Sequence, residues 1–167
     1  MAKRVCCQSL QEKLGGEQQH YSDTRSTFRE KGKEIRMDEL RNKKKYCFVH
    51  FEEVVNPKSD TGNQNESKRP DVLVRVCEEE EEDRFFFVEL KGTGIPAKIA
   101  YKQIVQGINH AKQSGLNCPK ISTYGVIVGS RMPSSNDWRD LKDQFKKRHG
   151  RDLIRANTAY SIPLNSQ

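Results

Sequence analysis

Three ionisable side chains stand at the ends of two neighbouring apolar segments. Residues 85–94, FFFVELKGTG, change from aromatic residues to a carboxylate and an ammonium group, Glu89 and Lys91. A second carboxylate, Asp71, follows Pro70 and begins the apolar segment 71–77, DVLVRVC. Side chains alternate along a strand, so Glu89 and Lys91 project from the same face. These residue types can hold a divalent cation and act on a water molecule.

The two segments predict an antiparallel hairpin that brings the acids together. An acidic turn, residues 78–83, separates them. Symmetric pairing about that turn sets Val72 opposite Val88 and therefore Asp71 opposite Glu89, with their Cβ atoms about 5 Å apart. Two carboxylates this close repel each other, which raises one pKa or requires a cation between them.

The oxygen ligands suit Mg²⁺, with Mn²⁺ as a possible substitute and water completing the shell. The backbone carbonyl of Leu90 lies between the two acids and can supply a further ligand. Lys91 can hold a water beside the metal and stabilise charge on a phosphate, as metal-assisted hydrolysis of a phosphodiester requires. The alternative is an ion pair at a sheet edge. A register slip of one residue would move the side chains to opposite faces.

The remaining segments predict one α/β domain over residues 1–167. Residues 8–45 have an interrupted helical pattern, with Ser22-Asp23 as a helix start, and Phe28, Ile35 and Leu40 form a thin apolar stripe. We expect strands at 45–55, 71–77, 84–91 and 122–130, helices at 96–115 and 134–150, and an edge strand near the C-terminus. The order α-β-β-β-α-β predicts a mixed central sheet flanked by helices. We expect residues 1–21 and 56–69 to be flexible, and the acidic turn to be solvated.

The sequence resembles the PD-(D/E)xK nuclease superfamily, which has the restriction-endonuclease-like fold. The matching residues are Pro70-Asp71 and Glu89-Leu90-Lys91. The resemblance implies that Asp71 and Glu89 bind Mg²⁺ and that Lys91 positions or activates the attacking water. It also implies a supporting polar residue on the following helix, for which Gln103 is the candidate. Many members add a glutamate from the first helix; the candidates here are Glu30, Glu34 and Glu39, with a slight preference for Glu39.

The charge balance favours an anionic partner. The net charge is +7 and the pI is about 9.2, with basic residues concentrated towards the two ends of the chain. An ordinary solvated surface is the alternative, because helix ends favour basic residues on electrostatic grounds alone. The candidate nucleic-acid contacts are Lys98, Lys102, Arg131, Lys146, Lys147 and Arg148.

The cysteine pattern predicts reduced thiols. There are five cysteines without CxxC spacing, and the adjacent Cys6 and Cys7 cannot form an ordinary disulfide with each other. We therefore expect an intracellular protein. No stretch has the apolar length to span a bilayer, and no secretory signal is evident at the start, so no membrane partner is expected.

Together these features lead to the hypothesis of an Mg²⁺-dependent endonuclease that acts on DNA. Cutting both strands of a duplex with one such site calls for a symmetric assembly, so we expect a homodimer or higher oligomer. Two alternatives stay open. One is an inactive nucleic-acid-binding module on the same fold, and the other is a protein-interaction or regulatory domain.

Overall fold

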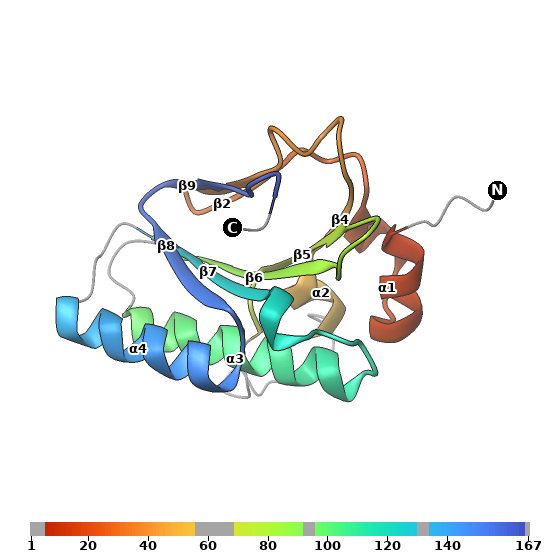
Figure 1. Cartoon of the computed structure of the whole chain (residues 1–167). Coiled ribbons are helices and arrows are strands. Elements are labelled where there is room, and N and C mark those ends of the chain that lie inside the picture. The colour runs from red at the N-terminus through yellow and green to blue at the C-terminus, as the bar shows by residue number, and fades with distance from the viewer. Residues whose placement is uncertain (1–5, 56–68, 92–95, 130–133, 166–167) are drawn as a thin grey trace, which may run out of the picture.

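The structure is a computed structural model that describes residues 6–55, 69–91, 96–129 and 134–165. It is an α/β protein with a mixed sheet flanked by helices, as the sequence predicts (Figure 1). None of the helices within these residues is long and apolar enough to cross a membrane.

The main sheet has six strands in the order β1-β4-β5-β6-β7-β8. Neighbours from β1 to β6 pair antiparallel, whereas β6, β7 and β8 run parallel. The strands are β1 (Tyr21–Ser22), β4 (Lys45–Val49), β5 (Val72–Cys77), β6 (Arg84–Leu90), β7 (Thr123–Val128) and β8 (Asp152–Ala156). A smaller sheet has the order β2-β3-β9 and consists of β2 (Thr27–Glu30), β3 (Lys33–Arg36) and β9 (Ala159–Ser161).

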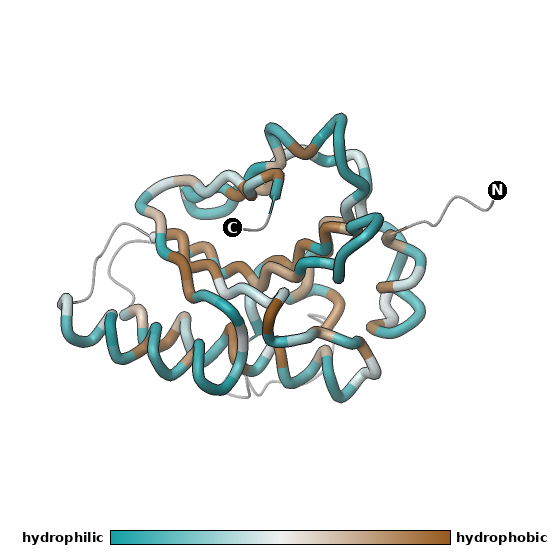
Figure 2. The backbone as a smooth tube through the Cα atoms, viewed as in Figure 1, coloured by the Kyte–Doolittle hydropathy of each residue, from teal (hydrophilic) through white to brown (hydrophobic). Residues whose placement is uncertain are grey.

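The helices pack on one face of the main sheet, and the small sheet covers the other (Figure 1). The α-helices are α1 (Cys6–Leu14), α2 (Phe51–Val55), α3 (Ala97–Gln113) and α4 (Ser135–Arg148), and short 3₁₀ turns η1 (Gln18–His20) and η2 (Lys120–Ser122) precede β1 and β7. The apolar residues concentrate on the central strands between these layers (Figure 2). Both faces of β5 and β6 are therefore buried, which explains why these two strands are almost wholly apolar.

The two predicted amphipathic helices are confirmed with small differences. Ile104, Ile108 and Ala111 of α3 are buried, but Ile99, which the sequence pattern adds to the same stripe, is 48% exposed. α4 buries its predicted apolar face, and Ser134 caps it by accepting a hydrogen bond from the backbone N–H of Asp137. The predicted caps were Ser135 or Asn136, so the start lies one residue earlier.

The helical prediction for residues 8–45 is wrong beyond α1. β2 and β3 form a hairpin in which Phe28 lies directly opposite Ile35. The turn between them, Lys31-Gly32, has positive φ at both residues, as two-residue hairpin turns often require. The apolar spacing that resembles a helical stripe is therefore a cross-strand pair. Ser22, predicted as a helix cap, lies in β1.

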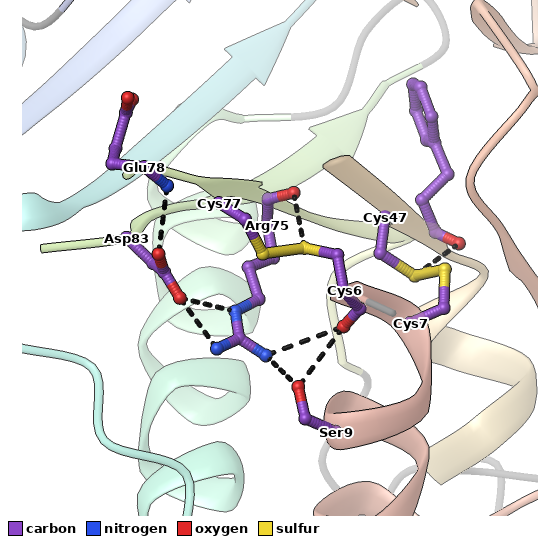
Figure 3. The surroundings of a disulfide bond; sticks show 9 residues. Cys6, Cys7, Ser9, Cys47, Arg75, Cys77, Glu78 and Asp83 are labelled. Atoms are coloured by element: carbon purple, nitrogen blue, oxygen red, sulfur yellow. Dashed lines mark hydrogen bonds and ion pairs between the residues drawn. A yellow bond between two sulfur atoms is a disulfide. The ribbon is translucent and has the colours of Figure 1, made fainter. Parts of the chain in front are cut away.

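The prediction of reduced cysteines is also wrong for four of the five. Cys6 is bonded to Cys77 and Cys7 to Cys47, so adjacent residues of α1 are cross-linked to β5 and β4 (Figure 3). Sequence spacing gave no indication of these pairs, because the partners are 71 and 40 residues apart. Residues 6–14, expected to be flexible, form a helix whose Leu10 is fully buried.

The acidic turn is solvated only at its centre. Glu78 is 9% exposed and accepts a hydrogen bond of 2.9 Å from Nε of Arg84, and it also pairs with Lys44. At the other end, Asp83 accepts hydrogen bonds of 2.6 and 2.9 Å from the guanidinium group of Arg75 (Figure 3). These ion pairs fix both ends of the hairpin turn and leave residues 79–82 exposed.

Candidate active site

The hairpin register that underlies the candidate site is confirmed. Val72 pairs with Val88 and Val76 with Arg84, which sets Asp71 opposite Glu89 at the open end of the hairpin. The Asp71 carboxylate accepts a hydrogen bond of 2.7 Å from the backbone N–H of Leu90. The site therefore forms where β5 begins and β6 ends.

Asp71 is fixed from both sides. Its backbone carbonyl accepts a hydrogen bond of 3.0 Å from the N–H of Phe51, the first residue of α2. Pro70, which precedes it, packs against α3 at Gly107, where an added Cβ would lie 2.6 Å from the proline ring. Gly107 thus permits α3 to approach the segment that carries the first carboxylate.

Glu89 and Lys91 form an ion pair on the same face of β6. Nζ of Lys91 lies 3.1 Å from Oε1 of Glu89, and both side chains are almost fully buried, at 8% and 3% exposed. The backbone N–H of Lys91 donates to the carbonyl of Val128 in β7, at 2.8 Å. Gly129 lies beside the Lys91 side chain, because a Cβ there would come within 3.3 Å of the Lys91 Cβ.

Burial and mutual repulsion perturb the two carboxyl groups. Burial raises the pKa of Asp71, and the nearby charge of Glu89 raises it further. Burial also raises the pKa of Glu89, although Lys91 and a hydrogen bond with the Asp71 carboxyl act in the opposite direction. Without a cation, the pair therefore keeps a proton up to a pH well above the range in which carboxyl groups usually titrate. A divalent cation would displace that proton.

Unsatisfied acceptors indicate which residues fit a cation. Among the described residues, three side-chain oxygens are buried and have no hydrogen-bond partner: Oε2 of Glu30, Oε2 of Glu89 and Oε1 of Gln103. Each buried polar atom without a partner destabilises the folded protein by about 1–3 kcal/mol, unless a ligand forms a hydrogen bond or a coordination bond with it. The N–H of Leu90 points towards Asp71. The N–H and C=O groups of one strand residue point to the same side of the strand, so the Leu90 carbonyl also faces Asp71. Asp71, Glu89 and this carbonyl can therefore provide oxygen ligands.

The protein ligands remain few. Within the described residues, no group of three or more His, Cys, Asp or Glu side chains is placed to hold a metal ion. Mg²⁺ commonly binds through one or two carboxylates and retains several waters. Two carboxylates and one carbonyl are compatible with that mode of binding.

Of the three glutamates predicted as candidates, Glu30 rather than the preferred Glu39 affects Asp71, and Glu52, which was not predicted, does so as well. Glu30 of β2 and Glu52 of α2 both act on Asp71 and raise its pKa, and Glu52 also raises that of Glu89. Glu39 is exposed in the turn between β3 and β4, and no hydrogen bond or ion pair joins it to Asp71 or Glu89 in the part of the chain described. Glu34 instead pairs with Arg29 and Arg36.

Glu52 was not predicted as a site residue, because the residue types of segment 45–55 favour a single strand. The strand ends at Val49, and α2 begins at Phe51. The pair Glu52-Glu53 immediately after an apolar strand is a usable signal, because acidic residues are favoured in the first turn of a helix.

The predicted basic contacts fall in two places. Lys98 and Lys102 are exposed on the first turns of α3, which follows the strand that carries Glu89 and Lys91. Lys146, Lys147 and Arg148 form the last turn of α4, after which the chain enters β8. Arg131 lies outside the described residues. Comparison of the chain with protein-family models, with curated proteins and with solved structures finds no match.

Proposed function

We propose that the protein is a metal-dependent endonuclease that hydrolyses phosphodiester bonds, with DNA as the substrate. The observation that carries the proposal is the arrangement of Asp71, Glu89 and Lys91. Two buried carboxylates from adjacent strands lie opposite each other, and a buried lysine pairs with one of them. This arrangement supports the resemblance to PD-(D/E)xK nucleases, including the expected restriction-endonuclease-like core.

Each residue has a role that its surroundings support. Asp71 and Glu89 would bind Mg²⁺ or Mn²⁺, with the Leu90 carbonyl as a further ligand. The metal would supply Lewis-acid stabilisation of a phosphate oxygen and would lower the pKa of a bound water. Lys91 would orient the attacking water and stabilise charge on the phosphate. The resemblance assigns a supporting role to Gln103 of α3, whose side-chain oxygen is buried and has no hydrogen-bond partner among the described residues. It would hold the same water or a ligand of the metal.

The side chains are buried in the structure, so a substrate phosphate reaches them only when neighbouring groups move aside. A homodimer would allow cleavage of both strands.

The intracellular location was predicted from reduced thiols and loses that support, because four of the cysteines are paired.

Cleavage assays test the proposal. Single-stranded, duplex and branched DNA and RNA are incubated with Mg²⁺, Mn²⁺ or EDTA, with wild type and with Asp71→Asn and Lys91→Ala. We expect metal-dependent cleavage by the wild type and a loss of at least about 10²-fold in each variant, since each removes a group acting in the transition state. Retained folding is checked by circular dichroism.

Two outcomes would count against the proposal. Undiminished cleavage by either folded variant would show that these residues do not act in the reaction. Nucleic-acid binding without cleavage or metal binding in calorimetry would favour an inactive binding module. Size-exclusion chromatography with light scattering tests the proposed oligomer.

A further inference from the structure

A second group of charged residues lies on the helical face, where η2, α3 and α4 meet. Lys112 comes from α3, Lys120 from η2, and Lys147 and Arg148 from α4. All four side chains are exposed. Nζ of Lys120 donates a hydrogen bond of 2.6 Å to the backbone carbonyl of Lys147, so η2 and the end of α4 are in contact.

His149 marks the centre of this group. Its ring packs against Tyr101 of α3 and Phe145 of α4, with centroid distances of 6.3 and 6.2 Å. Burial lowers the pKa of His149, and the positive charges of one residue from each element lower it further: Lys112, Arg148 and Lys120. Residues distant in sequence are thus collected around one side chain.

These positive charges are not neutralised. Within the described residues, none of the four forms an ion pair, whereas the adjacent Lys146 lies 3.9 Å from Asp152. Favourable interaction with a helix dipole accounts for basic residues at the ends of α3 and α4. Lys120 of η2 also interacts with the end of α4, because it donates to the Lys147 carbonyl. A helix end carries the equivalent of only about half a negative charge, so most of the four positive charges remain unbalanced.

We propose that Lys112, Lys120, Lys147 and Arg148, here called the η2 cluster, bind backbone phosphates of a nucleic-acid duplex at a distance from the cleavage site. This inference rests on the proposed nuclease function and identifies how its substrate would be held. α3 connects the two regions, because it begins after Lys91 and carries Lys98 and Lys102 on its exposed face. The whole helix contains no acidic residue.

The helix geometry sets the length of the required substrate. Lys98 and Lys112 are separated by about 21 Å along α3, at about 1.5 Å per residue. Phosphates of one strand follow each other every 3.4 Å along the duplex axis. A duplex that contacts both Lys98 and the η2 cluster must therefore span at least about six base pairs along α3.

Binding measurements without divalent metal test this inference. Fluorescence anisotropy in EDTA compares hairpin duplexes of about six and about 24 base pairs over a range of salt concentrations. The variant Lys112→Gln/Arg148→Gln is compared with Arg41→Gln/Lys43→Gln. This control removes the same net charge from exposed residues in the turn before β4.

We expect the η2 variant to bind the long duplex at least about tenfold more weakly, with a salt slope reduced by about two, as two lost phosphate contacts predict. The control and the short duplex should change little. Equal weakening by both variants, or none, would overturn the inference. If the wild type binds duplex and shows this difference but does not cleave with Mg²⁺, the nuclease proposal fails and the η2 cluster stands. If it cleaves and the η2 variant binds normally, only the inference fails.

Discussion

At the residue scale, the charged groups of the site are held in an environment unsuited to an unpaired carboxylate. Asp71 and Glu89 are 3% and 2% exposed, and burial raises the pKa of each. A structural ion pair would need one carboxylate for Lys91. The second carboxylate, Asp71, accepts a hydrogen bond from the Leu90 N–H, and the proposed metal ion would balance its charge.

This electrostatic arrangement predicts a pH dependence of stability. A carboxyl group in an unfolded chain titrates near pH 4, whereas the folded pair titrates higher. Between these values the folded state binds more protons, so the free energy of unfolding falls as pH rises. We compare the two proteins in EDTA. Between pH 5 and pH 8, the free energy of unfolding of the wild type should fall by on the order of 2 kcal/mol more than that of Asp71→Asn. The Asn side chain can still accept from Leu90.

Urea denaturation at several pH values measures this difference. Mg²⁺ should stabilise the wild type at pH 8, because it replaces the shared proton, and should leave Asp71→Asn unchanged. If the free energy of unfolding depends on pH in the same way in both proteins, the pKa values of the two carboxyl groups are not raised in the folded state.

At the element scale, α3 positions the site by its close approach to Pro70. A Cβ at Gly107 would lie 2.6 Å from the proline ring and 3.2 Å from Phe51. The Pro70 and Phe51 rings cannot move away from an added Cβ as easily as the end of a flexible side chain can. The contact therefore transmits the position of α3 to Asp71, the next residue in the chain.

Gly107→Ala tests this contact. Overpacking costs about 1–3 kcal/mol, and the helical preference of alanine offsets about 0.5–1 kcal/mol of it. We expect a modest loss of stability together with weaker Mg²⁺ binding in calorimetry. Asn109→Ala, exposed on the same helix, is the control and should leave both unchanged. Wild-type metal affinity in Gly107→Ala would show that α3 does not position Asp71.

At the scale of the whole molecule, α1 is joined to the main sheet by covalent bonds. Its nine residues are too few for a stable isolated helix. Arg75 adds a polar connection, because its guanidinium group contacts Ser9 and the Cys6 carbonyl beside the first turn of the helix (Figure 3). The two disulfides therefore close long loops and hold α1 against its core residues.

Reduction should destabilise the protein strongly. Loops of this length predict about 4 kcal/mol for each disulfide, so the Tm should fall by roughly 10 °C or more in reductant. Alkylation after denaturation without reductant should modify one thiol, Cys118, and alkylation after reduction should modify five. Five modified thiols without reductant would show that the disulfides do not form.

The β5–β6 hairpin, and with it the proximity of Asp71, Glu89 and Lys91, was predictable from the sequence alone. A symmetric acidic turn between two apolar runs favours one register, and side-chain alternation then places the three on one face. The helices α3 and α4 were predictable because their apolar residues recur at helical spacing over several turns.

The surroundings of that hairpin could not be predicted from the sequence, because they depend on contacts between distant segments. The small sheet, the disulfides, the approach of Glu30 and Glu52 to Asp71, and the η2 cluster all join residues that are far apart in sequence. The spacing of Phe28 and Ile35 fits either a helical face or a cross-strand pair, and packing against the main sheet selects the pair. Local patterns fix local geometry, whereas contacts between distant segments depend on how the layers fill space around a common core.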